Sequence, residues 1–423
     1  MNFISKIWSQ LFLIERPSIS LSFIRPIIAL TTIFYIGPTL CHLGDNYFPT
    51  AFKTTDPSFL PLGLIELVQR SPNWVIVLFV WVFAVFSFFF LVGFLSQLSC
   101  IVMVLSCYYF QALNSFHIGS TLSWDILLVA LFLFCLTPYH GDYFSVDCLL
   151  GGREDAYKRR RSYFLQRLLQ LHVGFMYFYT ALYKITAQGN WFTDNPLYYV
   201  LNYPSAGVTK YFILRDYLMN KPQLCYWLGV GIVVTELSMI LLLFWRKTRV
   251  SAIYLSFFFH IILLLTLDVP AILFFVFPTL ALLFINPDYI VDWIEQKRAA
   301  NAKIGPMILI YDGDCGFCRK CVRILKVADL FGVLKFVDFR GIDDLSQLHP
   351  SLTKEAATKQ AYLVEPSGKL FGGFFAFQKI SLNLPMFYSL APILYFPGMG
   401  LLGPVFYKIV SKNRFLFNKL LPN

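Results

Sequence analysis

The sequence predicts a polytopic α-helical membrane domain with about eight spans, followed by a small C-terminal α/β domain. Two observations carry this prediction. The chain is 57% hydrophobic and only 14% charged, whereas soluble proteins average about 25% charged residues, and its apolar residues gather in long runs before residue 290. From Pro306 onward, short apolar strands alternate with helical stretches, as in a sheet covered by helices.

Eight apolar segments approach the roughly 20 residues that a helix needs to cross a bilayer. They are Leu21–Leu40, Trp74–Phe94, Leu98–Ala112, Leu122–Tyr139, Tyr163–Lys184, Leu224–Trp245, Val250–Leu267 and Val269–Ile285. Around them we expect an interfacial N-terminal helix at residues 1–20, a membrane domain at 21–290, a linker at 291–305 and the α/β domain at 306–423.

The net charge of +11 does not indicate nucleic-acid binding, because the excess Lys and Arg residues lie in short clusters beside apolar segments. Such clusters follow the fourth, sixth and eighth segments, at Lys158–Arg161, Arg246–Arg249 and Lys297–Lys303. Clusters of this kind mark the cytoplasmic ends of membrane helices. We therefore expect an integral, multi-pass protein that contacts the lipid bilayer, with both termini and the C-terminal domain in the cytoplasm.

The most distinctive motif is the run Asp312-Gly313-Asp314-Cys315-Gly316-Phe317-Cys318. It lies between a predicted strand, Met307–Tyr311, and a predicted helix, Arg319–Leu330. A C-x-x-C pair at a strand-to-helix turn is typical of thiol–disulfide exchange, because the positive end of the helix dipole stabilises a thiolate. Six other cysteines lie in or beside apolar segments, where cysteine usually acts as a small buried hydrophobe. They are Cys41, Cys100, Cys107, Cys135, Cys148 and Cys225.

Within this motif Cys315 is the expected nucleophile, because it is nearer the helix start, and Cys318 one turn later is the expected resolving cysteine. Asp312 and Asp314 are expected either to transfer protons or to raise the thiol pKa. Cys321 extends the series to C-x-x-C-x-x-C, as in iron–sulfur sites, but no fourth ligand follows at the usual spacing. We therefore expect redox chemistry and no bound metal.

Ionisable side chains inside the apolar segments form a second group of candidates, because charges within a membrane are costly and usually face a cavity. The group comprises Arg25, Asp125, Arg167, His172, Lys184, Glu236, His260 and Asp268. Glu236 is near the middle of its segment and is the sharpest candidate. His172 shares a helix face with Tyr179 and Tyr183, which lie seven and eleven residues later.

A structural alternative stays open for these ionisable residues. Glu236 would pair with Arg25 or Arg167 and hold the helix bundle together. Residues near the segment ends would simply extend their charged groups to the membrane surface. These are Arg167, Lys184, Asp125 and Asp268.

The C-terminal motifs resemble the DCC family of predicted thiol–disulfide oxidoreductases over about residues 306–420. The matching pieces are Tyr311–Arg319, the later Gly372-Gly373, and the tail with Tyr407 and Asn413-Arg414. The resemblance implies a thioredoxin-like fold, and it places the family's Asp-x-x-Cys-x-x-Cys signature on Asp312, Cys315 and Cys318. It implies no cofactor requirement for the C-x-x-C pair.

The membrane segments carry a second resemblance, to the HTTM domain that is shared with vitamin K-dependent γ-carboxylases. The matching pieces are Tyr143–Asp147, Tyr177–Lys184 leading to Trp191, and Phe258–His260. In the carboxylases a lysine at this place acts as a base toward vitamin K hydroquinone, and Lys184 occupies it here. The resemblance makes a quinone in the membrane domain the candidate cofactor.

Three functions are consistent with this pairing of domains. The first is a membrane-bound thiol–disulfide oxidoreductase, similar to protein-disulfide reductases, that exchanges electrons with a redox protein partner or a quinone. The second is a carboxylase-like or other lipid-cofactor enzyme centred on Lys184. The third is a non-enzymatic transporter or scaffold. The first is the leading hypothesis, because it rests on the C-x-x-C motif.

Overall fold

The computed structural model is mostly helical and divides into two compact units. It describes residues 13–48, 61–114, 122–186, 190–202, 214–266, 273–414 and 416. The first unit comprises Met1–Arg16, Ser20–His140 and Arg160–Asn286, and the second comprises Pro17–Ile19, Gly141–Arg159 and Pro287–Asn423. Most of the interfacial helix predicted at residues 1–20 lies outside the described residues.

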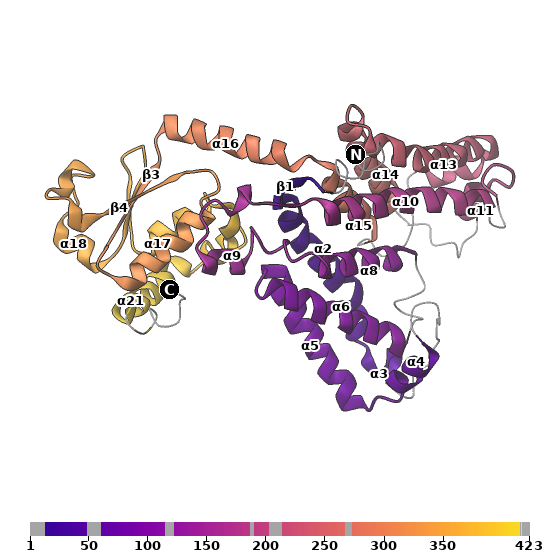
Figure 1. Ribbon diagram of the computed structural model, residues 1–423, viewed down its shortest axis with the longest axis horizontal. Coiled ribbons are helices and arrows are strands. Elements are labelled where there is room, and N and C mark those ends of the chain that lie inside the picture. The colour runs from indigo at the N-terminus through magenta and orange to yellow at the C-terminus, as the bar shows by residue number, and fades with distance from the viewer. Residues whose placement is uncertain are drawn as a thin grey trace. The chain divides into compact units, whose positions relative to one another are not determined.

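Each of the eight predicted membrane segments overlaps a helix of the first unit (Figure 1). These helices are α2 (Ile19–Leu40), α5 (Asn73–Val92), α6 (Ser96–Leu113), α8 (Leu122–Cys135), α10 (Phe164–Thr186), α13 (Pro222–Phe244), α14 (Arg249–Thr266) and α15 (Leu273–Ala281). Within the described residues, five of them are long and apolar enough to cross a membrane, namely α2, α5, α6, α13 and α14. The predicted count of about eight spans is therefore supported for five helices.

Shorter elements connect these helices. They are β1 (Glu15–Pro17), which pairs with β2 (Arg160–Ser162), α3 (Leu43–Asn46), α4 (Leu62–Gln69), α11 (Pro196–Asn202) and α12 (Arg215–Met219).

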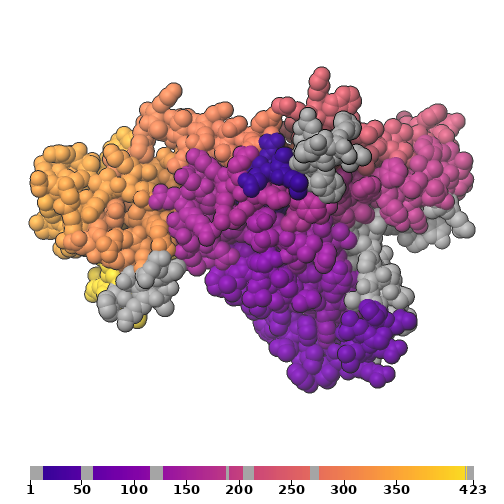
Figure 2. Space-filling view, viewed as in Figure 1, coloured from indigo at the N-terminus to yellow at the C-terminus, as the bar shows by residue number. Residues whose placement is uncertain are grey.

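Large apolar side chains lie on the outer surface of the first unit. Figure 2 gives a space-filling view of the chain, with this unit mainly in indigo to red. Helix α5 shows the pattern, because Trp74, Leu78, Trp81, Val85 and Phe88 are all exposed at intervals of three or four residues. Such an exposed apolar face is unfavourable in water, but it is the face that a helix turns toward lipid. The surface of α5 therefore agrees with an integral membrane protein.

The second unit contains a four-stranded mixed sheet in the order β4-β3-β5-β6. The strands are β3 (Met307–Tyr311), β4 (Leu334–Asp338), β5 (Tyr362–Val364) and β6 (Leu370–Gly372). Strand β3 pairs in parallel with β4 and antiparallel with β5, and β5 pairs antiparallel with β6. The parallel pair needs a crossover connection, which α17 (Gly316–Ala328) supplies.

Helices cover both faces of this sheet, and Figure 1 shows α17 and α18 (Lys354–Lys359) on either side of its strands. Because side chains alternate along a strand, Leu309 packs with Leu325 of α17 and Ile380 of α19 (Phe374–Ser381). Its neighbour Ile310 packs on the other face with Ala357 of α18. The chain then continues through α20 (Ala391–Leu394) to α21 (Met399–Lys412).

A segment from between the predicted fourth and fifth spans belongs to the second unit. It contains α9 (Val146–Gly151), and Arg323 of α17 donates a hydrogen bond to the Leu150 carbonyl at 3.0 Å. Gly152 has φ +64°, and a Cβ atom there would overlap the Arg323 side chain. All but the last residue of the predicted linker at 291–305 lie within helix α16 (Pro287–Ile304), which is part of the same unit.

Candidate active site

Cys315 is the N-cap residue of helix α17, and its Sγ atom accepts a hydrogen bond from the backbone N–H of Cys318 at 3.3 Å. The sulfur therefore satisfies one of the backbone donors that a helix start leaves without an intrahelical partner. A thiolate at this position gains from that donor and from the helix dipole. This local geometry favours Cys315 as the nucleophile.

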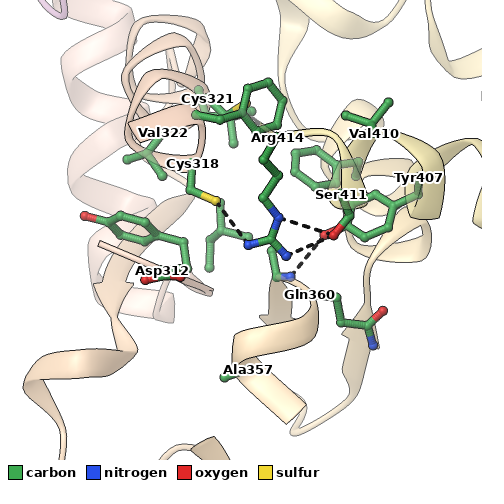
Figure 3. A pocket seen from close by; sticks show the side chains of 16 residues that line it. Asp312, Cys318, Cys321, Val322, Ala357, Gln360, Tyr407, Val410, Ser411 and Arg414 are labelled. Atoms are coloured by element: carbon green, nitrogen blue, oxygen red, sulfur yellow. Dashed lines mark hydrogen bonds between the residues drawn. The ribbon is translucent and has the colours of Figure 1, made fainter. Parts of the chain in front are cut away.

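The guanidinium of Arg414 lies beside Cys318, as Figure 3 shows, with its Nη1 atom 3.9 Å from the sulfur. Its Nη2 atom donates to the Lys359 carbonyl and to the Ser411 hydroxyl, both at 2.9 Å. These contacts, made at the end of α21, fix the side chain in place. Arg414 therefore brings a positive charge to the dithiol.

Burial raises the pKa of the Cys318 thiol to about 12 and that of Cys321 to about 11, because neither thiolate would be well solvated. Hydrogen bonding to Cys315 also raises the pKa of Cys318, whereas the charge of Arg414 lowers it. Cys318 consequently carries its proton at neutral pH. Cys318 is therefore poorly suited to begin an exchange reaction, which needs a thiolate.

The turn before Cys315 is fixed to the end of strand β4. Asp312 accepts hydrogen bonds from Arg340 Nε at 2.6 Å and Nη2 at 3.3 Å, and the Arg340 guanidinium also contacts Asp314 at 3.0 Å. The Gly313 N–H donates to Asp338 at 2.9 Å, and a Cβ atom on Gly313 would overlap that carboxylate. Each residue of the Asp-Gly-Asp run thus has a role in holding the turn.

Hydrogen bonding to Arg340 lowers the pKa of Asp312, so this carboxyl group is ionised at neutral pH. A general base works best when its pKa is near the operating pH. The lowered pKa of Asp312 therefore argues against proton transfer, one of the two roles predicted for this residue. Its contacts indicate a positioning role instead.

The Gly372-Gly373 pair lies where Gln360 and Tyr407 approach the backbone. Gly373 has φ +56°, and a Cβ atom there would lie 2.7 Å from Gln360 Oε1 and 3.1 Å from the Tyr407 ring. The Tyr407 hydroxyl accepts a hydrogen bond from the Ala361 N–H at 3.1 Å. Glycine therefore allows α21 to pack closely against the start of β5.

These side chains enclose a narrow pocket of about 60 Å³ beside the dithiol. Its lining is mainly apolar and includes Cys318, Cys321, Asp312, Tyr407, Ser411 and Arg414 (Figure 3). A space of this size holds only a few water molecules. The pocket keeps the Cys318 thiol largely away from bulk solvent, in agreement with its raised pKa.

Among the predicted membrane residues, the structure brings Lys184 and Glu236 together. The Lys184 Nζ atom lies 2.8 Å from both carboxylate oxygens of Glu236 and 5.6 Å from the centre of the Trp191 ring. Only 8% of the Glu236 side chain is exposed. The expectation that Lys184 extends to the membrane surface is wrong, because the buried carboxylate needs its charge as a partner.

The predicted pairing of Glu236 with Arg25 or Arg167 is also wrong. Arg25 donates to the carbonyl of His140 at 3.2 Å, and Arg167 donates to Gln170 Oε1 at 2.7 Å. Lys184 holds both oxygens of the Glu236 carboxylate, whereas the contacts described for the two arginines are made elsewhere. Glu236 does form an internal ion pair, but its partner is Lys184, the residue at the position of the catalytic base in the carboxylases that the membrane domain resembles.

The two candidate histidines are found in different surroundings. His260 is buried, its Nδ1 atom lies 2.8 Å from the Ser256 carbonyl, and its ring stacks on Phe277. His172 is half-buried on α10, on the side where Tyr179 and Tyr183 are exposed. Asp268 lies outside the described residues, as does the side chain of Asp125.

Sequence reasoning missed several polar residues of these sites. Arg340 comes shortly after strand β4, which is parallel to β3. Because the carboxyl ends of parallel strands meet at one edge of a sheet, this position could have predicted that Arg340 lies near the motif that follows β3. His140 is fully buried, and neither of its ring nitrogens has a hydrogen-bond partner among the described residues. No pattern in the sequence marked the contact of Cys100 and Cys135, whose sulfur atoms lie 3.5 Å apart.

Comparison with known protein families confirms both resemblances. Residues 19–289, more than half of the chain, match the family model of the HTTM domain. Residues 309–420 match the model described as DCC1-like thiol-disulfide oxidoreductase. No curated protein and no solved structure matches the chain. The chain therefore belongs to the HTTM domain family and carries a DCC1-like thiol-disulfide oxidoreductase domain after its membrane domain.

Proposed function

We propose that this protein is a membrane-bound thiol–disulfide oxidoreductase, similar to protein-disulfide reductases, whose redox pair is Cys315 and Cys318. The observation that carries the proposal is the position of Cys315 at the N-cap of α17, where its sulfur accepts the N–H of Cys318. The match to the DCC1-like family supports the same reaction class.

The reaction proceeds in two exchange steps. The Cys315 thiolate attacks one sulfur of the substrate disulfide, which forms a mixed disulfide and releases the other sulfur as a thiolate that takes up a proton. Cys318 then loses its proton and attacks the Cys315 sulfur, which releases the second substrate thiol. The substrate gains two electrons and two protons, and the enzyme is left with a Cys315–Cys318 disulfide.

A thioredoxin-like fold for the second unit is part of this proposal. It is supported by the parallel β3–α17–β4 unit that is followed by the antiparallel pair β5–β6 and helix α19. In this arrangement the dithiol lies at the carboxyl end of the central strand β3, which is a usual position for sites on α/β sheets.

The proposal also assigns the C-terminal domain to the cytoplasm. The basic clusters after the fourth, sixth and eighth predicted segments support this orientation. A cytoplasmic dithiol rests mainly in its reduced form. The orientation is tested with a membrane-impermeant maleimide, which should label Cys315 in inside-out vesicles and leave it unlabelled in right-side-out vesicles.

A quinone is the proposed electron source in the membrane, because the dithiol domain is joined to an HTTM domain. A hydroquinone would give two electrons and two protons to the Cys315–Cys318 disulfide and leave as the quinone. The test is quinone formation by the oxidised protein in nanodiscs with a soluble hydroquinone analogue. Formation that persists after Cys315→Ser would refute this coupling.

The main activity is tested with purified full-length protein in nanodiscs and a peptide whose fluorescence rises on disulfide reduction. We expect Cys315→Ser to abolish reduction and Cys318→Ser to stop after the first step, as a trapped mixed disulfide. Cys41→Ser, which removes an exposed cysteine of the other unit, is the control. Undiminished reduction by Cys315→Ser would overturn the proposed function.

The alternative of a lipid-cofactor enzyme centred on Lys184 is less well supported. The Lys184 Nζ atom is held by both oxygens of Glu236, a contact that would have to break before the amine could act as a base. A quinone-dependent carboxylation that Lys184→Ala abolishes and Cys315→Ser leaves unchanged would favour this alternative.

A further inference from the structure

A second hollow adjoins the narrow dithiol pocket. It is a groove of about 800 Å³, a size within the usual range of ligand sites. Residues of β5, β6, α19 and α21 line it. It shares one wall with the dithiol pocket, and this wall consists of Gln360, Tyr407, Ser411 and Arg414. A molecule in the groove therefore lies next to the pocket that Cys318 lines.

The lining of the groove carries charges of only one sign. Lys359, Lys408, Lys412 and Arg414 contribute side chains, and no Asp or Glu is among the lining residues. The three lysines are exposed, so their ammonium groups are open to a ligand. Because like charges gathered in a concave surface reinforce one another's field, the groove attracts anions.

The remaining lining is apolar and aromatic, with Tyr362, Leu370, Phe374, Phe375 and Pro404. Such a floor offers contact area to the carbon skeleton of a bound chain, while the lysines reach its charged groups. Ligand sites of this kind combine apolar walls with a few polar groups that fix orientation. The composition fits a polypeptide with acidic side chains better than a compact inorganic anion.

We propose that this groove binds an acidic segment next to the disulfide of the protein substrate. This inference rests on the proposed function and names the substrate class of the same site. A chain lying in the groove would place its neighbouring disulfide over the shared wall, within reach of the Cys315 sulfur. Its carboxylates would pair with Lys408 and Lys412, which lie one turn apart on α21.

The test uses reduced full-length protein in nanodiscs of phosphatidylcholine, so that no anionic lipid competes. The substrates are peptides of equal length with a single cysteine capped as a 2-thiopyridyl disulfide and flanked by glutamate, serine or lysine residues. Release of 2-thiopyridone gives the rate constant. Each value is divided by that for dithiothreitol, which corrects for the intrinsic reactivity of the peptide.

We expect the glutamate peptide to react about tenfold faster than the lysine peptide at low ionic strength. The difference should shrink near 1 M salt, where the Debye length is about 3 Å. The double variant Lys408→Glu with Lys412→Glu should remove or reverse the preference. Its control is Lys335→Glu with Lys354→Glu, which makes the same change in net charge at exposed lysines that do not line the groove.

The outcomes separate this inference from the proposed function. If no peptide is reduced, and Cys315→Ser behaves as the unaltered protein does, the proposed function itself fails. If all peptides are reduced through Cys315 at equal corrected rates, the function stands and the acidic-segment proposal is wrong. If in addition phosphatidylserine in the nanodiscs inhibits every peptide equally, the groove is a site for anionic lipid.

Discussion

The Arg414 guanidinium lies 3.9 Å from the Cys318 sulfur, although 96 residues separate the two in the chain. The positive charge partly offsets the effect of burial on the Cys318 pKa. Arg414 also forms part of the wall between the dithiol pocket and the basic groove. One side chain near the end of α21 thus links the chemistry of the thiols to the surface on which a substrate would lie.

Replacement of Arg414 is predicted to slow the second exchange step. Cys318 must lose its proton to attack, and Arg414→Ala removes the cation that favours its thiolate, so we expect resolution about tenfold slower. The mixed disulfide with substrate should accumulate, which mass spectrometry of acid-quenched samples would measure. Arg414→Lys should recover much of the rate. Equal rates for Arg414→Ala and the unaltered protein would contradict this role.

The same step is predicted to depend on pH in a defined direction. The pKa of Cys318 is raised to about 12, so the reactive thiolate is a small fraction that grows with pH. We expect the resolution rate to rise about tenfold per pH unit between about pH 6 and pH 9. Single-turnover kinetics of the preformed mixed disulfide would measure this slope. A rate independent of pH in that interval would mean that Cys318 does not resolve.

The Asp312–Arg340 ion pair is predicted to stabilise the second unit at neutral pH and to lose its effect in acid. The pKa of Asp312 is lowered below 3.8 in the folded protein. The contribution is therefore complete above that ordinary value and disappears as the pH falls through the lower folded pKa. Because Arg340 is partly exposed, the effect is modest.

Thermal unfolding of Asp312→Asn at several pH values would measure this contribution. The variant should unfold at a lower temperature than the unaltered protein at neutral pH, and the two should converge in acid. Asp343→Asn, an exposed residue of the same region, should change little at any pH. A constant difference across the pH range would show that the loss is not electrostatic.

Much of the second unit could be predicted from local sequence. The strand Met307–Tyr311 is confirmed with the predicted bounds, because an apolar run is a pattern of neighbouring residues. Helix α17 begins at Gly316, three residues before the prediction, because Cys315 itself is the N-cap.

The partners of the site residues could not be predicted in this way. The Arg340–Asp312 and Lys184–Glu236 pairs join residues 28 and 52 positions apart. Such contacts depend on which helices and strands pack together in three dimensions. The periodicity of apolar residues along the chain carries no information on that packing. The family motif did include Arg414, but its place beside Cys318 became apparent only from the packing of α21.

Substitution of Gly373 is predicted to destabilise the second unit. Gly373→Ala places a Cβ atom near Gln360 and Tyr407 at a backbone with φ +56° and ψ −123°, and a residue in such a sparsely populated conformation costs about 1–3 kcal/mol. Gly341→Ala, where no atom lies within 4 Å of the added Cβ, should be nearly neutral. Chemical denaturation of both variants would compare them, and equal stabilities would exclude a packing role for Gly373.

Cys100 and Cys135 are predicted to form a disulfide when the protein is treated with the membrane-permeant oxidant diamide. Their sulfur atoms lie 3.5 Å apart and need to approach to about 2.05 Å for a bond. Diamide takes up the two electrons and two protons that the thiols release. Peptide mapping should find the disulfide that joins α6 to α8. If Cys315 and Cys318 are fully oxidised and this disulfide is absent, the two helices do not come close enough for the bond to form.

The Lys184–Glu236 pair is predicted to stabilise the membrane domain, because each partner compensates the buried charge of the other. Removal of one partner leaves a buried charge without compensation, which costs about 3–5 kcal/mol. Both Lys184→Met and Glu236→Gln should therefore lower the unfolding midpoint in detergent. The double variant leaves no unpaired charge and should recover most of the loss.

Quinone-dependent reduction of the Cys315–Cys318 disulfide in the stable double variant decides between the two roles. If the double variant is stable and keeps this activity, the pair only holds α10 and α13 together. If it is stable and the activity is lost, while direct chemical reduction of the dithiol is unchanged, the pair belongs to an electron-transfer or cofactor site.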